Sequence, residues 1–193
     1  MQQIKHQHFI LHKPYGYLSQ LINNQNKRRN KRLLGELFDF PEGTMAIGRL
    51  DENSEGLLFL TTDGKVSETI RSAKVEKEYY AQVDGIITAD AIEQLQNGVE
   101  ISVNGSKYVT KPCAAKSIEN VSTFPFANRK VRDARHGPTS WVSITLTEGK
   151  FRQVRKMTAA VGFPTLRLVR VRIGNVLLKQ ETGSIEKVNS FFN

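Results

Sequence analysis

The chain has 193 residues, of which 39% are hydrophobic and 24% are charged, as is typical of an ordinary globular protein. Its 28 Lys and Arg residues against 19 Asp and Glu give a net charge of +9, which favours a polyanionic partner over an inert basic surface. No apolar run is long enough to span a bilayer, no secretory signal is present, and a single cysteine, Cys113, excludes an internal disulfide. We therefore expect a cytoplasmic protein with one domain over residues 1–193, or two lobes that share one sheet.

The N-terminal part predicts short strands and loops. A first strand is predicted over 9–12, where an apolar run ends before a proline, and a second around 17–19. The Asn- and Lys-rich stretch 23–32 indicates a loop. Residues 33–38 predict a short helix that stops before Pro41.

Residues 48–64, GRLDENSEGLLFLTTDG, form the most informative stretch of the chain. The apolar run predicts a buried strand over 56–61, and Asp51 lies in the charged loop directly before it. Because a buried strand fixes the position of the loop that enters it, Asp51 is the main candidate for a catalytic side chain. After the strand, Asp63 predicts the N-cap of a helix that runs through Arg71.

The middle of the chain alternates between strand and helix patterns. Residues 79–84 place Tyr79, Ala81 and Val83 on one side, as a half-buried strand requires. Thr88 predicts the cap of a helix that ends at Gly98. Residues 99–121 predict two strands, joined at the hairpin dipeptide Asn104-Gly105.

The last third predicts an exposed loop, a strand, a helix and a further strand: 123–139, 142–146, 151–161 and 166–173. Hairpins and helical connections therefore occur in the same chain. We expect an α+β fold with a mixed, largely antiparallel central sheet and flanking helices, not a doubly wound parallel sheet.

Positive charge is concentrated in three clusters: KRRNKR at 27–32, RKVRDARH at 129–136 and KFRQVRK at 150–156. The first is compatible with a solvated loop. In the third, Lys150, Arg152, Arg155 and Lys156 crowd the first turns of a predicted helix, where the helix dipole disfavours cations. This pattern requires a nearby anion, either a protein carboxylate or a phosphate, unless the segment is simply a solvated Arg-rich turn.

Three segments together resemble a known family. Residues 48–64 match the consensus GRLDxxTxGLLLLTNDG, residues 77–80 match a KxY motif, and residues 148–174 match EGRNRQVRRM followed by VGHPVLRLxRxxIG. Their order and spacing resemble those of the Rsu-type pseudouridine synthases, from about residue 8 to residue 178. The resemblance implies the pseudouridine synthase catalytic fold and isomerisation of a specific uridine in large-subunit ribosomal RNA, with no cofactor and no metal. We expect a monomer without the small N-terminal S4-type RNA-binding module of many relatives.

The resemblance also implies roles for individual residues. Asp51 matches the essential aspartate, Arg155 its basic partner, and Tyr79 the tyrosine that stacks on the target base. The expected substrate-binding residues are the apolar pocket residue and three cations: Leu168, Arg49, Arg152 and Lys156. Two positions depart from the family pattern, because Ser54 replaces the usual Thr and Phe151 stands where Asn is common.

The residues alone leave other interpretations open. Tyr79 and Leu168 are compatible with simple core positions, Arg49 with a surface ion pair, and Asp51 with a turn-capping aspartate. The main alternative function is a non-catalytic RNA-binding or ribosome-assembly protein on the same fold. An aspartate among cations argues against it, since binding to RNA alone requires no carboxylate.

Three other kinds of site are disfavoured. Glu52 and Glu55 resemble a glycosidase pair, but the positive charge and the lack of aromatic sugar platforms argue against it. A nucleotide-binding loop is disfavoured because Arg49-Leu50 stand where such a loop would carry a Lys-Ser/Thr pair. A zinc site built on His6, His8 and His12 is disfavoured because Cys113 stands alone and His136 is distant in sequence.

Overall fold

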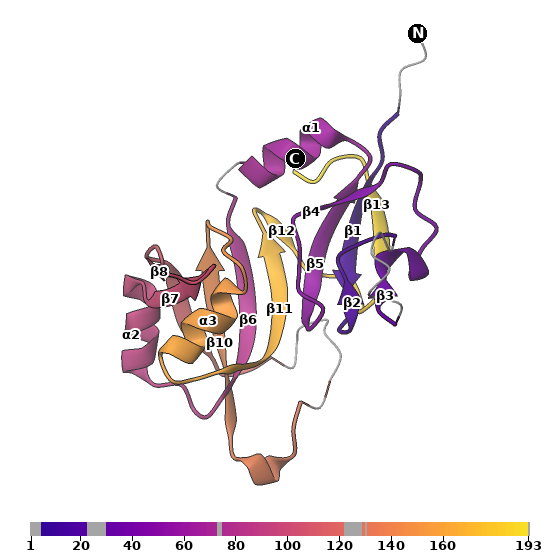
Figure 1. Cartoon of the computed structure of the whole chain (residues 1–193). Helices are drawn as coiled ribbons and strands as arrows, with labels where there is room; N and C mark the ends of the chain where they lie inside the picture. Colours follow the sequence, from indigo (N-terminus) through magenta and orange to yellow (C-terminus); the bar gives the residue numbers. More distant parts are fainter. Residues whose placement is uncertain (1–4, 23–29, 73–74, 122–128, 130, 193) are drawn as a thin grey trace. The chain divides into compact units, whose positions relative to one another are not determined.

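The computed structural model describes residues 5–22, 30–72, 75–121, 129 and 131–192 (Figure 1). These residues form two compact units. Unit 1 contains the described residues of Met1–Val75 and Gly174–Asn193, and unit 2 contains those of Glu76–Phe124 and Asn128–Ile173. Each unit has a hydrophobic core of its own. The expectation of a single domain over residues 1–193 stays a prediction.

The sheet of unit 1 is antiparallel and is built on a strand that is buried along its whole length. This strand, β5 (Ser54–Thr61), carries the apolar run of the sequence, and all of its residues are buried. It pairs with β1 (His8–Lys13) and β4 (Met45–Ile47), and β1 pairs in turn with β13 (Ile185–Val188). The two strands predicted for this sheet are therefore confirmed, and β4 and β13 are additional. A short strand, β12 (Val176–Leu177), lies in the C-terminal segment.

The region between β1 and β4 holds a short parallel strand pair and a single 3-10 turn: β2 (Tyr17–Leu18), β3 (Arg32–Leu33) and η1 (Leu34–Glu36). The helix predicted over 33–38 is therefore only one turn long. The chain leaves the turn because Phe38 and Phe40 pack against Phe9, with ring centroids 5.9 and 5.5 Å from that of Phe9. Aromatic packing in the core outweighs the local helix pattern here.

Helix α1 (Gly64–Ser72) begins as the sequence predicts. Asp63 Oδ1 accepts hydrogen bonds from the backbone N–H groups of Lys65 (2.8 Å) and Val66 (3.3 Å). The hydrogen bond from Val66 lowers the pKa of Asp63 below its ordinary value, as expected of an N-cap carboxylate. Ile70 is buried, and the predicted cap is confirmed.

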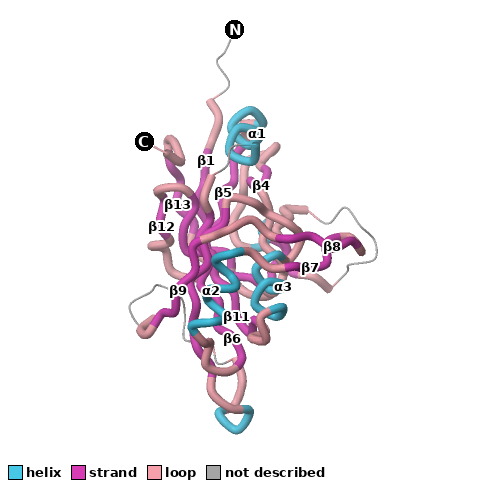
Figure 2. Tube along the Cα trace, turned by 90° about the vertical axis from the view of Figure 1, so that its left-hand side faces the viewer, coloured by secondary structure: helices cyan, strands magenta, loops and turns pink. Residues whose placement is uncertain are grey.

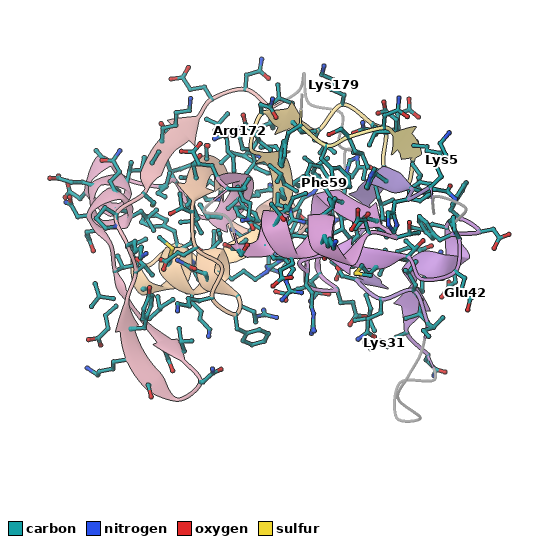
Figure 3. All side chains as sticks on the ribbon, turned by 90° about the horizontal axis from the view of Figure 1, so that it is seen from above. Lys5, Lys31, Glu42, Phe59, Arg172 and Lys179 are labelled. Carbon is teal, nitrogen blue, oxygen red and sulfur yellow. The ribbon has the colours of Figure 1, made fainter. Side chains whose placement is uncertain are left out.

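The C-terminal segment of unit 1 packs on the aromatic side chain of Phe59, which is labelled in Figure 3. Phe191 stacks on Phe59 with ring centroids 4.3 Å apart and an interplanar angle of 12°. Phe192 approaches the same ring edge-on at 6.0 Å. The stack holds the end of the described chain against β5.

Four antiparallel strands of unit 2 form a sheet in the order β11-β6-β10-β9. These strands are β6 (Lys77–Asp84), β9 (Ala114–Ile118), β10 (Thr139–Leu146) and β11 (Thr165–Ile173). Helices α2 (Ala89–Asn97) and α3 (Gln153–Ala160) share one core with the apolar face of this sheet (Figure 2). The α+β class with mixed, largely antiparallel pairing is confirmed, since the pairs described above within each unit are antiparallel except for β2–β3, which is parallel.

The predicted alternation along β6 is confirmed, and β10 alternates in the same way. Ala81, Val83, Val142 and Ile144 are fully buried in the core shared with the helices. Their sequence neighbours point to the opposite face of the sheet, which carries polar side chains such as Ser143. One face of the unit 2 sheet is therefore apolar and the other is largely polar.

The segment between the helices of unit 2 contains one more strand than the sequence predicts. A hairpin is joined by Asn104 and Gly105, with φ angles of 51° and 82°, and its strands are β7 (Glu100–Val103) and β8 (Ser106–Val109). The hairpin prediction is confirmed, but residues 99–121 hold three strands, because β9 pairs separately with β10. Pro112 has no N–H to donate, so the chain leaves the hairpin and rejoins the sheet at Ala114.

Helix α2 follows its predicted limits. Thr88 Oγ1 accepts a hydrogen bond from Ala91 N at 3.2 Å, and Gly98 ends the helix with a φ of 95°. Of the predicted loop over 123–139, residues 123–128 and 130 lie outside the described residues, and the rest contains a 3-10 turn, η2 (Ala134–His136). None of the described helices is long and apolar enough to cross a membrane.

Candidate active site

Asp51 lies half-buried in unit 1, in the loop of residues 48–54 that enters β5. Its neighbour Leu50 is buried, and the Leu50 backbone N and O are both hydrogen-bonded to Ser19 Oγ, at 3.0 and 2.8 Å. On the other side, Ser54 N donates to Asp51 O at 3.0 Å. Hydrogen bonds on both sides of Asp51 therefore fix the backbone from which its carboxylate extends.

Lys13 holds the same loop, and the sequence analysis missed this residue. Its side chain is 0% exposed, and Nζ donates to Ser54 O (2.8 Å), Pro14 O (3.0 Å) and Glu52 O (3.4 Å). Burial of an ammonium group costs several kcal/mol unless polar groups compensate it, and these carbonyl oxygens do so. A lysine that ends an apolar strand and precedes a proline was the available signal.

The described members of the first basic cluster interact with the protein itself. Lys31 (labelled in Figure 3) donates from Nζ to both carboxylate oxygens of Glu52, at 2.8 and 2.9 Å. The Arg32 guanidinium lies over the ring of Tyr17, 4.1 Å from its centroid. The remaining Lys and Arg of this cluster, residues 27–29, lie outside the described residues. Arg49, the predicted phosphate contact, is exposed on loop 48–54.

Tyr79 and Leu168 lie in unit 2 and belong to the same packed cluster. Leu168 is 6% exposed and pairs in register with Ala81 of β6. Tyr79 is half-buried and packs against this core. Both side chains therefore contribute to packing, and their base-contacting roles stay predictions.

Arg155 lies half-buried on α3, also in unit 2. The helix is fixed by Val154 and Met157, which are buried in the core of the unit. Arg155 Nη1 donates to the backbone oxygen of Thr165, the first residue of β11, at 3.3 Å. Its position is thus set by two elements of unit 2, whereas Asp51 belongs to unit 1. The proposed pairing of the two side chains stays a prediction.

The start of α3 differs from the sequence prediction. The helix begins at Gln153 rather than 151, and Arg152 occupies the N-cap with a left-handed φ of 54°. Lys150 and Arg152 therefore precede the helix, and the expectation that they stand in its first turns is wrong. Arg155 and Lys156 do lie in the first turn, so part of the unfavourable pattern of charge remains.

A carboxylate lies at the start of this helix. Glu148 accepts hydrogen bonds from Tyr108 Oη (2.5 Å), Gln153 Nε2 (2.6 Å) and Lys111 N (3.0 Å). Burial raises the pKa of Glu148, but these hydrogen bonds outweigh it and leave the pKa below its ordinary value. Glu148 is thus a carboxylate near the start of the helix that the sequence analysis did not single out, and the anion that pairs with the cations of this segment stays a prediction.

Loop 148–153 and the first turn of α3 carry the other predicted substrate-binding cations, Arg152 and Lys156. Arg152 is exposed, and Lys156 Nζ donates to Ser102 O at 2.6 Å. The same ammonium lies 5.2 Å from the centroid of the Phe151 ring, which is 64% exposed. Cations and an exposed aromatic ring therefore share one surface of unit 2.

The second basic cluster belongs to unit 2, and two of its arginines pair with carboxylates of that unit. Arg132 Nη2 donates to Asp84 Oδ1 at 2.5 Å, and this hydrogen bond lowers the pKa of Asp84. Arg135 is highly exposed and forms an ion pair with Asp133 at 3.2 Å. The cluster thus contributes both a structural arginine and a solvated one.

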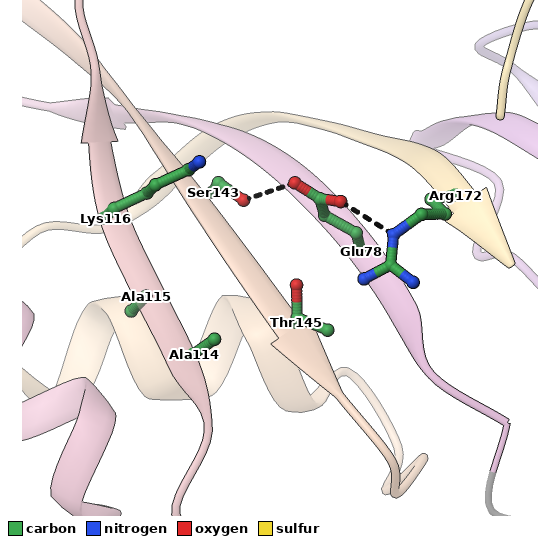
Figure 4. A pocket seen from close by; sticks show the side chains of 7 residues that line it. All are labelled: Glu78, Ala114, Ala115, Lys116, Ser143, Thr145 and Arg172. Carbon is green, nitrogen blue, oxygen red and sulfur yellow. Dashed lines mark hydrogen bonds and ion pairs between the residues drawn. The ribbon is translucent and has the colours of Figure 1, made fainter. Parts of the chain in front are cut away.

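A hollow of about 260 Å³ opens on unit 2 (Figure 4). At its centre, Glu78 accepts hydrogen bonds from Ser143 Oγ (2.8 Å) and Arg172 Nε (2.9 Å). Arg172 Nη1 also donates to Glu76 at 3.0 Å, and the hydrogen bond that Arg172 donates to Glu78 contributes most to the raised pKa of Arg172. The charged groups of this hollow bind one another in an ion-pair network. None of the predicted site residues is among the residues that line it.

No arrangement among the described residues points to a metal site. Within them, no group of three or more His, Cys, Asp or Glu side chains is placed to hold an ion. Burial raises the pKa of the Cys113 thiol to about 11, so it is not a reactive thiolate near neutral pH.

Comparisons with known proteins identify relatives of this chain. The family described as RNA pseudouridylate synthase matches residues 7–160. A ribosomal large subunit pseudouridine synthase E of Xanthomonas axonopodis pv. citri (strain 306) is 40% identical over 168 residues, covering 86% of this chain and 85% of that protein. A protein of the same name from Vibrio vulnificus (strain CMCP6) is 38% identical over 172 residues, covering 88% of this chain and 69% of that protein.

Solved structures support the fold. A crystal structure described as a pseudouridylate synthase has a TM-score of 0.75 and 26% identity, covering 97% of this chain and 72% of that one. Human RNA pseudouridylate synthase domain containing 1 has a TM-score of 0.55 and 15% identity, covering 90% of this chain and 80% of that one. The second likeness concerns the fold alone. The expected catalytic fold is thereby confirmed.

Proposed function

The chain belongs to the RNA pseudouridylate synthase family, and we propose that it isomerises a uridine of large-subunit ribosomal RNA to pseudouridine. One observation carries this proposal: the range matched by the family, 7–160, contains Asp51, Tyr79 and Arg155. Two relatives at 40% and 38% identity are named for activity on the large subunit. The proposal includes a monomer that acts in the cytoplasm without a cofactor or a metal.

Asp51 is the proposed catalytic carboxylate. The reaction breaks the N1–C1′ bond and forms a C5–C1′ bond, while C5 loses a proton and N1 gains one, so no oxidant or co-reactant is needed. Attack on C1′, addition to the base and removal of a ribose proton are three routes that all use an ionised carboxylate. The hydrogen bonds from Lys13 and Ser19 support each route, because they fix the loop that carries Asp51.

Arg155 is proposed to keep Asp51 ionised and to orient it through a charge-assisted hydrogen bond. Tyr79 is proposed to stack on the target base, and Leu168 to line the base pocket. Tyr79 is half-buried and packs against the core that contains Leu168. Stacking on the target base therefore requires one face of the Tyr79 ring to be accessible.

The cations of the chain are proposed to bind the RNA backbone. The target uridine must leave its stack before its glycosidic bond can react, which costs a few kcal/mol. Phosphate contacts from Arg49, Arg152 and Lys156 would offset this cost, and the net charge of +9 favours encounter with RNA.

Tritium release from large-subunit RNA labelled at C5 of uridine tests the function. The wild-type chain should release tritium, and Asp51→Asn should lower the rate by about 100- to 10,000-fold with RNA affinity within threefold of wild type. Glu52→Gln, which changes the adjacent acid, is the matched control and should retain turnover. RNA binding without any tritium release by the wild-type chain would instead favour the non-catalytic alternative.

A further inference from the structure

Phe151 is an exposed aromatic side chain in a region of positive charge. Its side chain is 64% exposed, and its sequence neighbours are Lys150 and Arg152. Lys156 Nζ lies 5.2 Å from the ring centroid, within the range of a cation–π interaction. No acidic residue occurs between Glu148 and Glu181 in the sequence, so the ring stands in a long cationic segment.

The loop that carries Phe151 is tightly closed. Gln153 N donates to Lys150 O at 3.1 Å, and Lys150 N donates to Gln153 Oε1 at 2.9 Å. These two bonds close a turn with Phe151 and Arg152 at its two central positions. Gln153 is buried and is held in turn by Glu148, so the base of the turn is fixed to unit 2. The aromatic ring is therefore presented at the tip of a preorganised turn, which lowers the entropic cost of binding.

The backbone of this turn carries strain at Arg152. Its φ of 54° is left-handed, and the other non-glycine residue with a positive φ among those described is Asn104, in a hairpin turn. Glycine or asparagine is usual at the third position of such a turn, because a larger side chain costs about 1–2 kcal/mol there. The chain thus keeps an arginine next to Phe151 in sequence, at a position where glycine would be less strained.

Resting on the proposed function, we propose that Phe151 is a stacking platform for an unpaired base of the RNA substrate, with Arg152 and Lys156 beside it to contact the adjacent phosphates. An aromatic ring offers a face to any base, and cations next to the ring attract the backbone. A docking surface for a protein would require neighbouring apolar side chains, whereas the sequence neighbours of Phe151 are cations.

Fluorescence anisotropy with a labelled single-stranded oligouridylate and a labelled RNA duplex tests the platform. Phe151→Ala should weaken binding of the single strand about tenfold and change binding of the duplex less than twofold. Phe151→Asn should behave like Phe151→Ala, and Phe151→Leu should not restore binding. Val109→Ala is the matched control, because Val109 is 65% exposed in the same unit, and it should bind both RNAs as the wild type does.

Phe151→Trp gives a second readout that does not depend on a loss of affinity. This variant should bind the single strand within about twofold of wild type, and oligouridylate should quench its fluorescence well beyond any change seen for wild-type Trp141. Unchanged fluorescence, unchanged affinity of Phe151→Ala, or equal losses on both RNAs would each overturn the proposal.

Kinetics separate this proposal from the proposed function. Phe151→Ala should raise the KM for large-subunit RNA about tenfold and leave kcat within twofold, since the ring contacts RNA outside the reacting base. A wild-type chain that releases tritium while Phe151→Ala has an unchanged KM would contradict the platform alone. A wild-type chain that releases none would contradict the proposed function, and the fluorescence of Phe151→Trp would still report on stacking.

Discussion

Loop 48–54 and loop 148–153 carry proposed functional side chains, and each is held by a group of the opposite charge to the one it presents. The first presents the Asp51 carboxylate and is held by the buried ammonium of Lys13. The second presents the Arg152 guanidinium and is held by the carboxylate of Glu148 through Gln153. In both cases hydrogen bonds to the charged group fix the backbone of the loop.

The two loops differ in what the holding group binds. Lys13 donates to backbone oxygens, which are present whatever side chains the loop carries. Glu148 accepts from Tyr108 and Gln153 side chains as well as from a backbone N–H, and it is itself an acid with a lowered pKa. The first loop should therefore tolerate substitutions and acid better than the second.

Arg155→Ala should have the largest effect, because Arg155 is the proposed basic partner of the catalytic carboxylate. Turnover should fall about 100-fold if the guanidinium keeps Asp51 ionised and oriented, while RNA affinity should change less than threefold. Single-turnover tritium release and RNA anisotropy measure the two quantities. The control is Arg135→Ala, at an exposed arginine. Equal losses of turnover and affinity would mean that Arg155 contacts an RNA phosphate and does not support Asp51.

Lys13→Met should weaken loop 48–54 strongly, since it leaves buried carbonyl oxygens without their donor. We expect the free energy of unfolding to fall by about 3 kcal/mol and turnover to fall at least about tenfold. Urea denaturation and tritium release check these values, with the exposed Lys5 changed to Met as the control. A free energy within about 0.5 kcal/mol of wild type would show that the loop does not depend on Lys13.

Glu148→Gln should weaken loop 148–153 by a smaller amount, about 1–2 kcal/mol near neutral pH, because some hydrogen bonds survive. The pKa of Glu148 in the folded chain is below its ordinary value of 4.5, so its stabilisation is complete above that pH and is lost as the pH falls below it. Urea denaturation at a series of acidic pH values should show a shallower loss for Glu148→Gln than for wild type. If the free energy of unfolding fell equally with pH in both proteins, the Glu148 carboxylate would not stabilise this loop. The control is Glu93→Gln, at an exposed glutamate.

Lys31→Met should have the smallest effect, although Lys31 binds the residue next to Asp51. Its side chain is 43% exposed, and exposed ion pairs contribute less than about 1 kcal/mol. Thermal unfolding and tritium release should both lie close to wild type. A large loss of turnover would mean that loop 48–54 depends on its surface ion pair as well as on Lys13.

Local patterns predicted much of the fold. The apolar run of β5, the Asp63 cap of α1 and the Asn104-Gly105 turn all depend on residues close in sequence, and all are confirmed. The added strand β9 and the short η1 were missed because they follow from Pro112 and from aromatic packing on Phe9, which periodicity does not report.

The candidate site was only partly accessible from the sequence. Motif resemblance selected Asp51, Tyr79 and Arg155, but the groups that hold loops 48–54 and 148–153 were missed. Lys13 acts on carbonyl oxygens about forty residues away, and Glu148 accepts from partners at similar separations. The left-handed backbone of Arg152 was also unpredictable, because a residue other than Gly or Asn gives no signal for it.

Mapping of pseudouridines in large-subunit ribosomal RNA tests the central claim most directly. RNA from cells that express the wild-type chain should be compared with RNA from cells that express only the Asp51→Asn variant at the same level. We predict that one uridine is converted in the first sample and unconverted in the second, with every other modified position alike. An identical set of pseudouridines in both samples would contradict the assignment of Asp51 as the catalyst of this modification.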